Sequence, residues 1–221
     1  MPHPGFDTSD YPGDDHMRTW KAHSPYEWVG YYLGGPCHSD HSWRGKRAFI
    51  EELGFHILPV FVGNQGGTGC GHGNLTPARG AQDGKDAVAA MAADGFPHLR
   101  YVYLDVEPVD VVTSVQQDYI RAWIESVLQD ARYLPAMYLH RKNADVLRNI
   151  LTQELHAHGH HAPARMWVCG GPASFSINDV PGRSTVPDAF AWQGELDTNH
   201  TFGGVTIHID QSVSLTPTPG E

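Results

Sequence analysis

The run Ile57-Leu-Pro-Val-Phe-Val62 is the feature that most restricts how this chain can fold. All six residues are apolar, without the alternation expected of a strand that has one face in water. Such runs are typical of strands buried on both faces, as in a parallel sheet covered by helices. Similar short runs recur along the chain and alternate with helical stretches, which predicts an α/β fold.

Eight segments have the character of short β-strands. They lie around residues 5–7, 28–33, 57–62, 101–107, 136–140, 166–169, 190–193 and 205–210. Helical patterns occupy residues 43–53, 83–94, 114–130 and 143–158. Residues 170–189 are interrupted by prolines, and residues 194–204 are too short for a helix with two loops, so Gly203-Gly204 predicts a turn. The pattern predicts a modified, incomplete TIM-type barrel of about five β/α units followed by three further strands.

The helix over residues 114–130 carries the clearest local signals. Ser114 and Gln117 have the spacing of a capping box, and Val115 begins an apolar stripe that we expect to face the core. In the helix over residues 143–158 we expect Val146 to face inward for the same reason.

Length and charge limit the classes of protein to consider. The 221 residues suit a single barrel domain over residues 1–214, followed by a flexible tail over the Pro- and Thr-rich residues 215–221. A formal charge of −10 argues against nucleic acid and is compatible with a neutral polysaccharide. No apolar run is long enough to span a membrane, and residues 1–5 lack the features of a signal peptide. We expect a monomer that needs no cofactor, in a compartment that the sequence leaves open.

Clusters of cysteine, histidine and glycine raise the questions of a disulfide, a metal site and a phosphate-binding loop. Cys37 and Cys70 follow adjacent predicted strands at the same barrel end, so they either form a disulfide or remain thiols with Cys169. The histidines at positions 156, 158, 160 and 161 invite a zinc hypothesis, but histidines at a helix end need no metal, and we expect none. The Gly-rich residues 63–73 lack the Lys-Ser/Thr ending of a phosphate-binding loop, so we expect them to be mobile.

The acidic pair Asp105 and Glu107 is the strongest candidate for chemistry. The residues are two apart at the end of an apolar strand that we expect Pro108 to close. On a strand they share one face, about 6–7 Å apart, while Val106 points into the helix layer. Two crowded carboxyl groups tend to keep one proton, and a protonated acid beside a carboxylate suits glycoside cleavage. The alternative is a solvated acidic loop at the end of the strand.

Other polar and aromatic residues fall at predicted strand ends, where active sites of β/α barrels gather. They include Asp7, Tyr32, Tyr138, Trp192 with Gln193, and Asp210. His208 shares a strand face with Asp210, and we expect it to point into the barrel below the site, as a ligand contact or as a hydrogen-bonded interior histidine.

Four segments in this order resemble glycoside hydrolase family 25 lysozymes. They are Gly5-Phe-Asp7-Thr-Ser9, Asp105-Val-Glu107, Trp192-Gln193 and Ile209-Asp210. The chain looks even more similar to the related glycoside hydrolase-like barrel domains of unknown function, through residues 54–63, 80–84 and 95–97. The D-x-D-x-E motif of family 18 chitinases fits less well, because Tyr103 stands at its first Asp.

The resemblance implies a peptidoglycan muramidase built on a barrel. Glu107 would be the general acid/base, and Asp105 would assist the substrate acetamido group or stabilise the oxocarbenium-like state. Asp7 and Asp210 would tune this pair and hold the sugar. Tyr32, Tyr138 and Trp192 would be platforms for sugar faces, with Gln193 among the substrate-binding residues. The alternatives are a catalytically silent cell-wall-binding module and, more remotely, a metal-dependent hydrolase.

Overall fold

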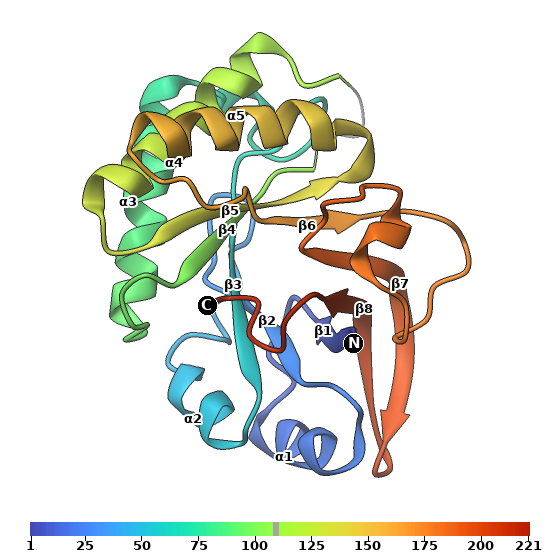
Figure 1. Cartoon of the computed structure of the whole chain (residues 1–221). Coiled ribbons are helices and arrows are strands. Elements are labelled where there is room, and N and C mark those ends of the chain that lie inside the picture. Colours follow the sequence, from blue (N-terminus) through green and yellow to red (C-terminus); the bar gives the residue numbers. More distant parts are fainter. Residues whose placement is uncertain (108–110) are drawn as a thin grey trace.

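The computed structural model describes residues 1–107 and 111–221, and in this part of the chain eight strands close into a barrel in sequence order (Figure 1). The strands are β1 (His3–Asp7), β2 (Trp28–Tyr32), β3 (His56–Val62), β4 (Tyr101–Asp105), β5 (Leu134–His140), β6 (Met166–Cys169), β7 (Ala191–Phe202) and β8 (Val205–Ser214). The helices are α1 (Asp14–His23), α2 (Arg47–Glu52), α3 (Pro77–Ala93), α4 (Ser114–Asp130) and α5 (Ala144–Ala157). Short 3₁₀ turns occupy His72–Asn74, Arg141–Asn143 and Pro181–Ser184.

The strand directions confirm the predicted architecture of five β/α units followed by three strands. Strands β1 to β7 pair in parallel, each with the next along the chain. Strand β8 runs antiparallel to both β7 and β1 and closes the barrel. The turn at Gly203-Gly204 joins β7 and β8 into a long hairpin, as predicted.

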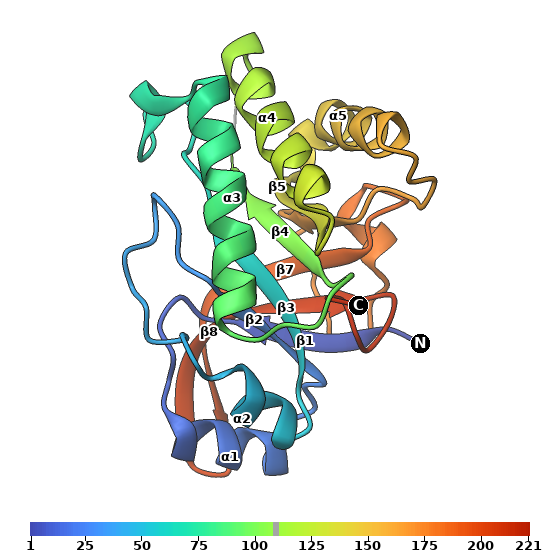
Figure 2. The same cartoon turned by 90° about the vertical axis from the view of Figure 1, so that its left-hand side faces the viewer.

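The helices cover the barrel unevenly (Figures 1 and 2). Helices α3, α4 and α5 pack side by side on one flank, while α1 and α2 lie on another. The connection from β6 to β7, residues 170–189, contains no α-helix. It is an extended segment with one 3₁₀ turn, and this turn packs against β7. The far part of the hairpin packs on α1, where the Trp20 indole donates a 3.0 Å hydrogen bond to the Val205 carbonyl.

Large aromatic side chains fill the barrel interior. Trp28 and Trp167 are fully buried there, with ring centroids 6.0 Å apart. Glycines on neighbouring strands make room for them, since a Cβ added at Gly5 would lie 2.1 Å from the Trp28 indole. At Gly30 an added Cβ would lie 2.6 Å from the Cβ of Asp7. The barrel interior is therefore a packed core, and Asp7, the last residue of β1, lies at one end of it.

Several local predictions were wrong. Helix α1 was missed because only Met17 and Trp20 of its ten residues are buried and most of the others are polar or charged. The capping box of α4 is formed by Thr113 and Gln116, one residue earlier than predicted. Val115, in the first turn of α4, is 53% exposed and Val146 of α5 is 41% exposed, so neither faces the core as predicted.

The last seven residues were predicted to be a flexible tail, but they pack across the barrel. The Gly220 carbonyl accepts a 2.9 Å hydrogen bond from the Tyr101 amide, and the Pro219 carbonyl accepts one of 2.8 Å from the Tyr103 hydroxyl. Both Pro219 and Gly220 are buried, and Glu221 forms an ion pair with Arg100. These contacts lie at the start of β4, the end of the barrel opposite Asp105.

Candidate functional site

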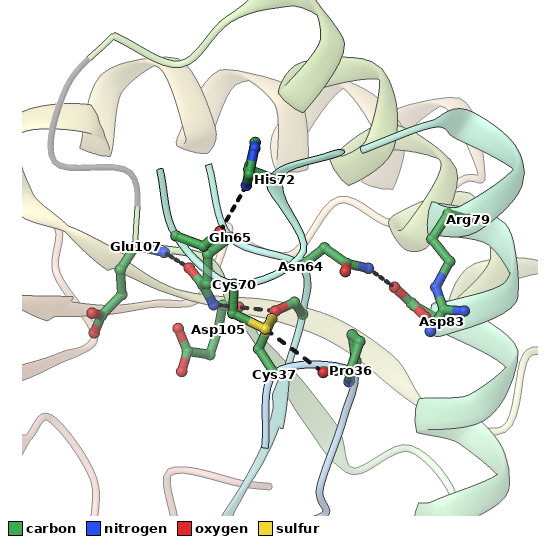
Figure 3. The surroundings of a disulfide bond; sticks show 12 residues. Pro36, Cys37, Asn64, Gln65, Cys70, His72, Arg79, Asp83, Asp105 and Glu107 are labelled. Carbon is green, nitrogen blue, oxygen red and sulfur yellow. Dashed lines mark hydrogen bonds and ion pairs between the residues drawn. A yellow bond between two sulfur atoms is a disulfide. The ribbon is translucent and has the colours of Figure 1, made fainter. Parts of the chain in front are cut away.

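The acidic pair lies where the sequence predicted it, at the end of β4. Tyr103 and Asp105 share the interior face of the strand, and Val106 is buried in the helix-facing core. Glu107 follows just beyond the strand and is exposed, whereas Asp105 is half-buried. Figure 3 shows the two carboxyl groups extending to the same side of the chain. Pro108 lies outside the described residues.

A second group of polar side chains lies at the seam where β1, β7 and β8 meet. Asp7 and Asp210 are direct partners in the antiparallel register of β1 and β8. The Gln193 side-chain nitrogen donates to both, at 2.9 Å to Asp7 and 3.1 Å to Asp210. The Tyr32 hydroxyl donates a 2.9 Å hydrogen bond to the other Asp7 oxygen. The structure therefore joins the predicted residues from the first and last strands into one network.

Burial raises the pKa of three carboxyl groups around this end of the barrel. It raises the pKa of Asp7 well above its usual range, reinforced by Asp210, while hydrogen bonds from Gln193 and Tyr32 oppose the shift. It also raises the pKa of Asp105 well above its usual range, with the Glu107 charge as the next cause. The pKa of Asp210 is raised by burial as well, although a bond from the Asp197 amide opposes the shift. Protons are therefore retained in this carboxyl cluster at higher pH than in solution.

A cavity of about 140 Å³ opens beside Asp7, Tyr32 and Asp210. The hairpin forms one wall of it with His208 and Asp197, and residues 8 and 9 form another. The Asp197 amide, in left-handed backbone with φ of 54°, donates a 2.6 Å hydrogen bond to Asp210. The cavity and its hairpin wall suit a polar ligand that lies across the open end.

His208 does not point into the barrel below the site, as was predicted. It is exposed on the hairpin above Asp210, with a 3.2 Å hydrogen bond to Asn199. The prediction placed Asp210 at the end of its strand and His208 below it, which would hold for a strand parallel to its neighbours. Because β8 runs the other way, the residue two positions before Asp210 lies farther from the barrel rather than deeper in it.

Two aromatic residues predicted as sugar platforms are core residues. Trp192 lies on the face of β7 opposite Gln193, fully buried against Phe175, and its indole donates to the Gly170 carbonyl at 2.8 Å. Tyr138 is inside the barrel, and its hydroxyl donates a 2.5 Å hydrogen bond to Gln193. Tyr32, half-buried at the cavity edge, keeps an accessible surface.

Gln65 is a site residue that the sequence did not reveal. It comes from the Gly-rich loop after β3, and its side chain reaches the backbone of both Asp105 and Glu107 (Figure 3). No local motif marks it, because its role depends on how the loop folds back over β4.

The Gly-rich loop was predicted to be mobile, but it is tied to its neighbours. A disulfide joins Cys70 to Cys37 in the loop after β2, with 5.7 Å between the Cα atoms, which decides between the two alternatives for this pair. Cys169 is a buried free thiol inside the barrel, and burial raises its pKa to about 12.

No group of three or more potential metal ligands occurs among residues 1–107 and 111–221. The rings of His156 and His161 lie 5.4 Å apart, and His158 hydrogen-bonds the Glu154 carbonyl at 3.0 Å. Within the same residues, no helix has the length and apolar character needed to cross a bilayer.

In the described part of the chain, a closed eight-stranded barrel with five helices carries carboxyl groups at one end, the architecture of a glycoside hydrolase-like domain. Residues 18–214 match the family described as Rv2525c-like, glycoside hydrolase-like domain, and the chain belongs to this family. The resemblance inferred from the sequence is thereby confirmed. No curated protein sequence matches the chain.

Solved structures with the same fold include a Tat-secreted protein, a bacterial lysozyme and an autolysin. The Tat-secreted protein Rv2525c of Mycobacterium tuberculosis has a TM-score of 0.59 at 16% identity, covering 98% of this chain and 96% of that one. A lysozyme from Streptomyces coelicolor has a TM-score of 0.57 at 15% identity, covering 98% and 93%. The autolysin LytC of Streptococcus pneumoniae, in complex with a synthetic peptidoglycan ligand, has a TM-score of 0.66 at 12% identity, covering 96% and 46%. At these identities the similarity establishes the fold.

Proposed function

We propose that this domain is a glycosidase that hydrolyses N-acetylated glycan of the bacterial cell wall, with Glu107 as general acid/base. One observation carries the proposal. A buried carboxylate oxygen of Asp105 has no hydrogen-bond partner among the described residues, and it lies beside the exposed carboxyl of Glu107 at the open end of the barrel. A buried acceptor without a partner is costly, so a donor from a bound substrate would complete this site.

The geometry favours a substrate-assisted route over a protein nucleophile. Asp7 is 2% exposed, and its two oxygens already accept hydrogen bonds from Gln193 and Tyr32, so it is poorly placed to attack a sugar. Asp105 would accept the N–H of the substrate acetamido group, whose carbonyl oxygen would attack the anomeric carbon. Glu107 would protonate the departing glycosidic oxygen and then remove a proton from the incoming water.

Three further observations support a cell-wall substrate. The structural neighbours include a lysozyme and an autolysin bound to a peptidoglycan ligand. The Cys37–Cys70 disulfide would persist in an oxidising compartment, such as the outside of a bacterial cell. A neutral or weakly charged glycan would also avoid repulsion from the acidic cluster.

The test is digestion of purified bacterial cell walls, measured as newly formed reducing ends. The wild-type protein should release them, and Glu107→Gln should reduce the rate by at least about 100-fold, because the acid/base proton is lost. Glu125→Gln, on the exposed face of α4, is the matched control and should keep the wild-type rate. Equal rates for Glu107→Gln and the wild type would contradict the proposed mechanism.

The same preparation separates the enzyme from a silent binding module. Co-sedimentation with cell walls but no release of reducing ends would support a carbohydrate-binding barrel that has lost turnover. Activity that is indifferent to chelators would eliminate a metal-dependent hydrolase.

A further inference from the structure

Gln65 connects the two acidic residues through their backbone atoms. Its side-chain nitrogen donates to the Asp105 carbonyl at 3.1 Å and to the Gly63 carbonyl at 3.2 Å. Its side-chain oxygen accepts a 2.7 Å hydrogen bond from the Glu107 amide. Glu107 lies two residues beyond the end of β4, so no ladder of strand hydrogen bonds extends to it. The Gln65 side chain supplies a hydrogen bond at this point in place of a neighbouring strand.

Gln65 is itself held by the loop that carries it. Its amide donates a 2.8 Å hydrogen bond to the carbonyl of Cys70, which is joined by the disulfide to Cys37. The preceding residue, Asn64, is 2% exposed and donates through its side chain to Asp83 at 2.8 Å. The Asn64 amide donates to the Tyr119 hydroxyl at 3.0 Å. The loop is thus tied to the β2 loop and to helices α3 and α4 (Figure 3).

At two glycines the backbone of this loop lies very close to neighbouring side chains. A Cβ added at Gly66 would lie 1.4 Å from the Gln116 side chain, which belongs to the capping box of α4. A Cβ added at Gly71 would lie 2.0 Å from the Asn64 side-chain oxygen, and Gly71 has a φ of 70°. The loop passes close to these side chains, and the positive φ of Gly71 favours glycine at that position.

We propose that Gln65 is a positioning residue that sets the place of Glu107 relative to Asp105, a role that rests on the proposed function of these two carboxyl groups. A neutral amide suits this role because it donates to one backbone and accepts from the other. It also adds no third negative charge beside the acidic pair. Displacement of a catalytic group by about 1 Å can reduce a rate by about 100-fold, so the bond to the Glu107 amide bears directly on turnover.

Two substitutions separate positioning from bulk packing. Gln65→Met keeps the length of the side chain and loses all three side-chain hydrogen bonds. We expect kcat for cell-wall digestion to fall between about 10-fold and about 100-fold, with KM within about threefold of the wild type, because the catalytic group rather than the binding surface moves. Gln117→Met is the matched control. That glutamine is also half-buried and bonds one backbone carbonyl, that of Val112, and its loss should leave kcat unchanged.

Gln65→Glu tests the electrostatic part of the role. It keeps an acceptor for the Glu107 amide and adds a charge beside two carboxyl groups. Like charges disfavour ionisation, so the acid limb of the kcat/KM profile should move to higher pH, while kcat at its new optimum stays above that of Gln65→Met. An unchanged pH profile in this variant would contradict the placement of the Gln65 side chain beside the acidic pair.

Hydrogen exchange of the Glu107 amide, measured by NMR, reports on its hydrogen bond to Gln65 and does not require catalytic activity. Exchange should be at least about tenfold faster in Gln65→Met than in the wild type or in Gln65→Glu, because a hydrogen-bonded amide is protected. If the wild type releases no reducing ends, the proposed function fails, and faster exchange in Gln65→Met still supports the positioning contact. Unchanged exchange at Glu107 overturns the proposal, whatever happens to kcat. Faster exchange together with a wild-type kcat overturns it as well.

Discussion

Asp7 and Asp210 lie directly opposite each other in the antiparallel pairing of β1 with β8, so closure of the barrel brings two carboxyl groups together. The amide of Gln193, from the strand on the other side of β8, donates to both. A negative charge on either carboxyl group disfavours ionisation of the other, whereas the hydrogen bonds from the shared donor, Gln193, favour the ionised forms. The strand that closes the fold therefore also completes the polar network of the site.

Replacing Gln193 with leucine should destabilise the barrel. The glutamine is 1% exposed, and its loss leaves Asp7, Asp210 and the Tyr138 hydroxyl without their shared partner. Leaving buried polar groups unpaired costs about 1–3 kcal/mol, so the free energy of unfolding in urea should fall by that amount. Gln82→Leu removes an exposed hydrogen bond to Asp86 and should change it by less than about 0.5 kcal/mol. Equal effects of the two substitutions would show that the hydrogen bonds of Gln193 to Asp7 and Asp210 contribute nothing to the free energy of unfolding.

The raised carboxyl pKa values predict how stability changes with pH. A folded-state pKa above the unfolded value of about 3.9 means that the native state binds more protons, so this contribution to stability is present at low pH and is lost as pH rises. Asp7→Asn removes the titrating group from its buried position. Relative to the wild type, the variant should gain stability in urea denaturation as pH rises from about 4 to neutrality.

Asp118→Asn is the control for this pH series, because Asp118 is exposed on α4. Its difference from the wild type should stay flat over the same pH range. A flat difference for Asp7→Asn as well would mean that Asp7 ionises in the folded protein as it does in solution.

Much of the barrel could be predicted because buried strands leave local signals. The apolar run before Gly63 and the alternation through Tyr103, Asp105 and Val106 depend only on which face of a strand meets the core, and the structure confirms both. The direction of β8 has no such signal. It follows from the antiparallel pairing across the turn at Gly203-Gly204. The turn was predicted but the pairing direction was not, and this reversed the expected position of His208.

The site could be predicted only in part, because contacts between distant segments leave no local signal in the sequence. Asp7, Asp105, Glu107 and Asp210 were found through motifs at strand ends, although their catalytic roles remain predictions. Gln65 was missed because a long-range contact from a Gly-rich loop has no periodicity. Trp192 was misassigned because an aromatic at a strand end packs inward or outward depending on one residue of register.

Removing the disulfide should weaken both the fold and the site. A cross-link that closes a loop of 33 residues restricts the unfolded chain, and Cys37→Ser with Cys70→Ser should lower the free energy of unfolding by about 4 kcal/mol. Exchange of the Glu107 amide should rise in the same variant, because the Gln65 amide bonds the Cys70 carbonyl. Dithiothreitol should affect the wild type and leave the double variant unchanged. A loss below about 1 kcal/mol would contradict the entropic account.

Gly30→Ala should disturb the site from inside the barrel. The new Cβ would lie 2.6 Å from the Cβ of Asp7 and 3.5 Å from the Trp167 ring, and strands fixed on both sides leave little room to relax. Overpacking of this kind costs about 1–3 kcal/mol in unfolding free energy. Asp7 should also move away from Gln193 and Tyr32, so cell-wall digestion should fall together with stability. Gly73→Ala is the control, because an added Cβ there meets nothing within 4 Å. A Gly30→Ala protein with wild-type stability and activity would mean that Asp7 can shift without consequence, and that the network around it does not constrain the acidic pair.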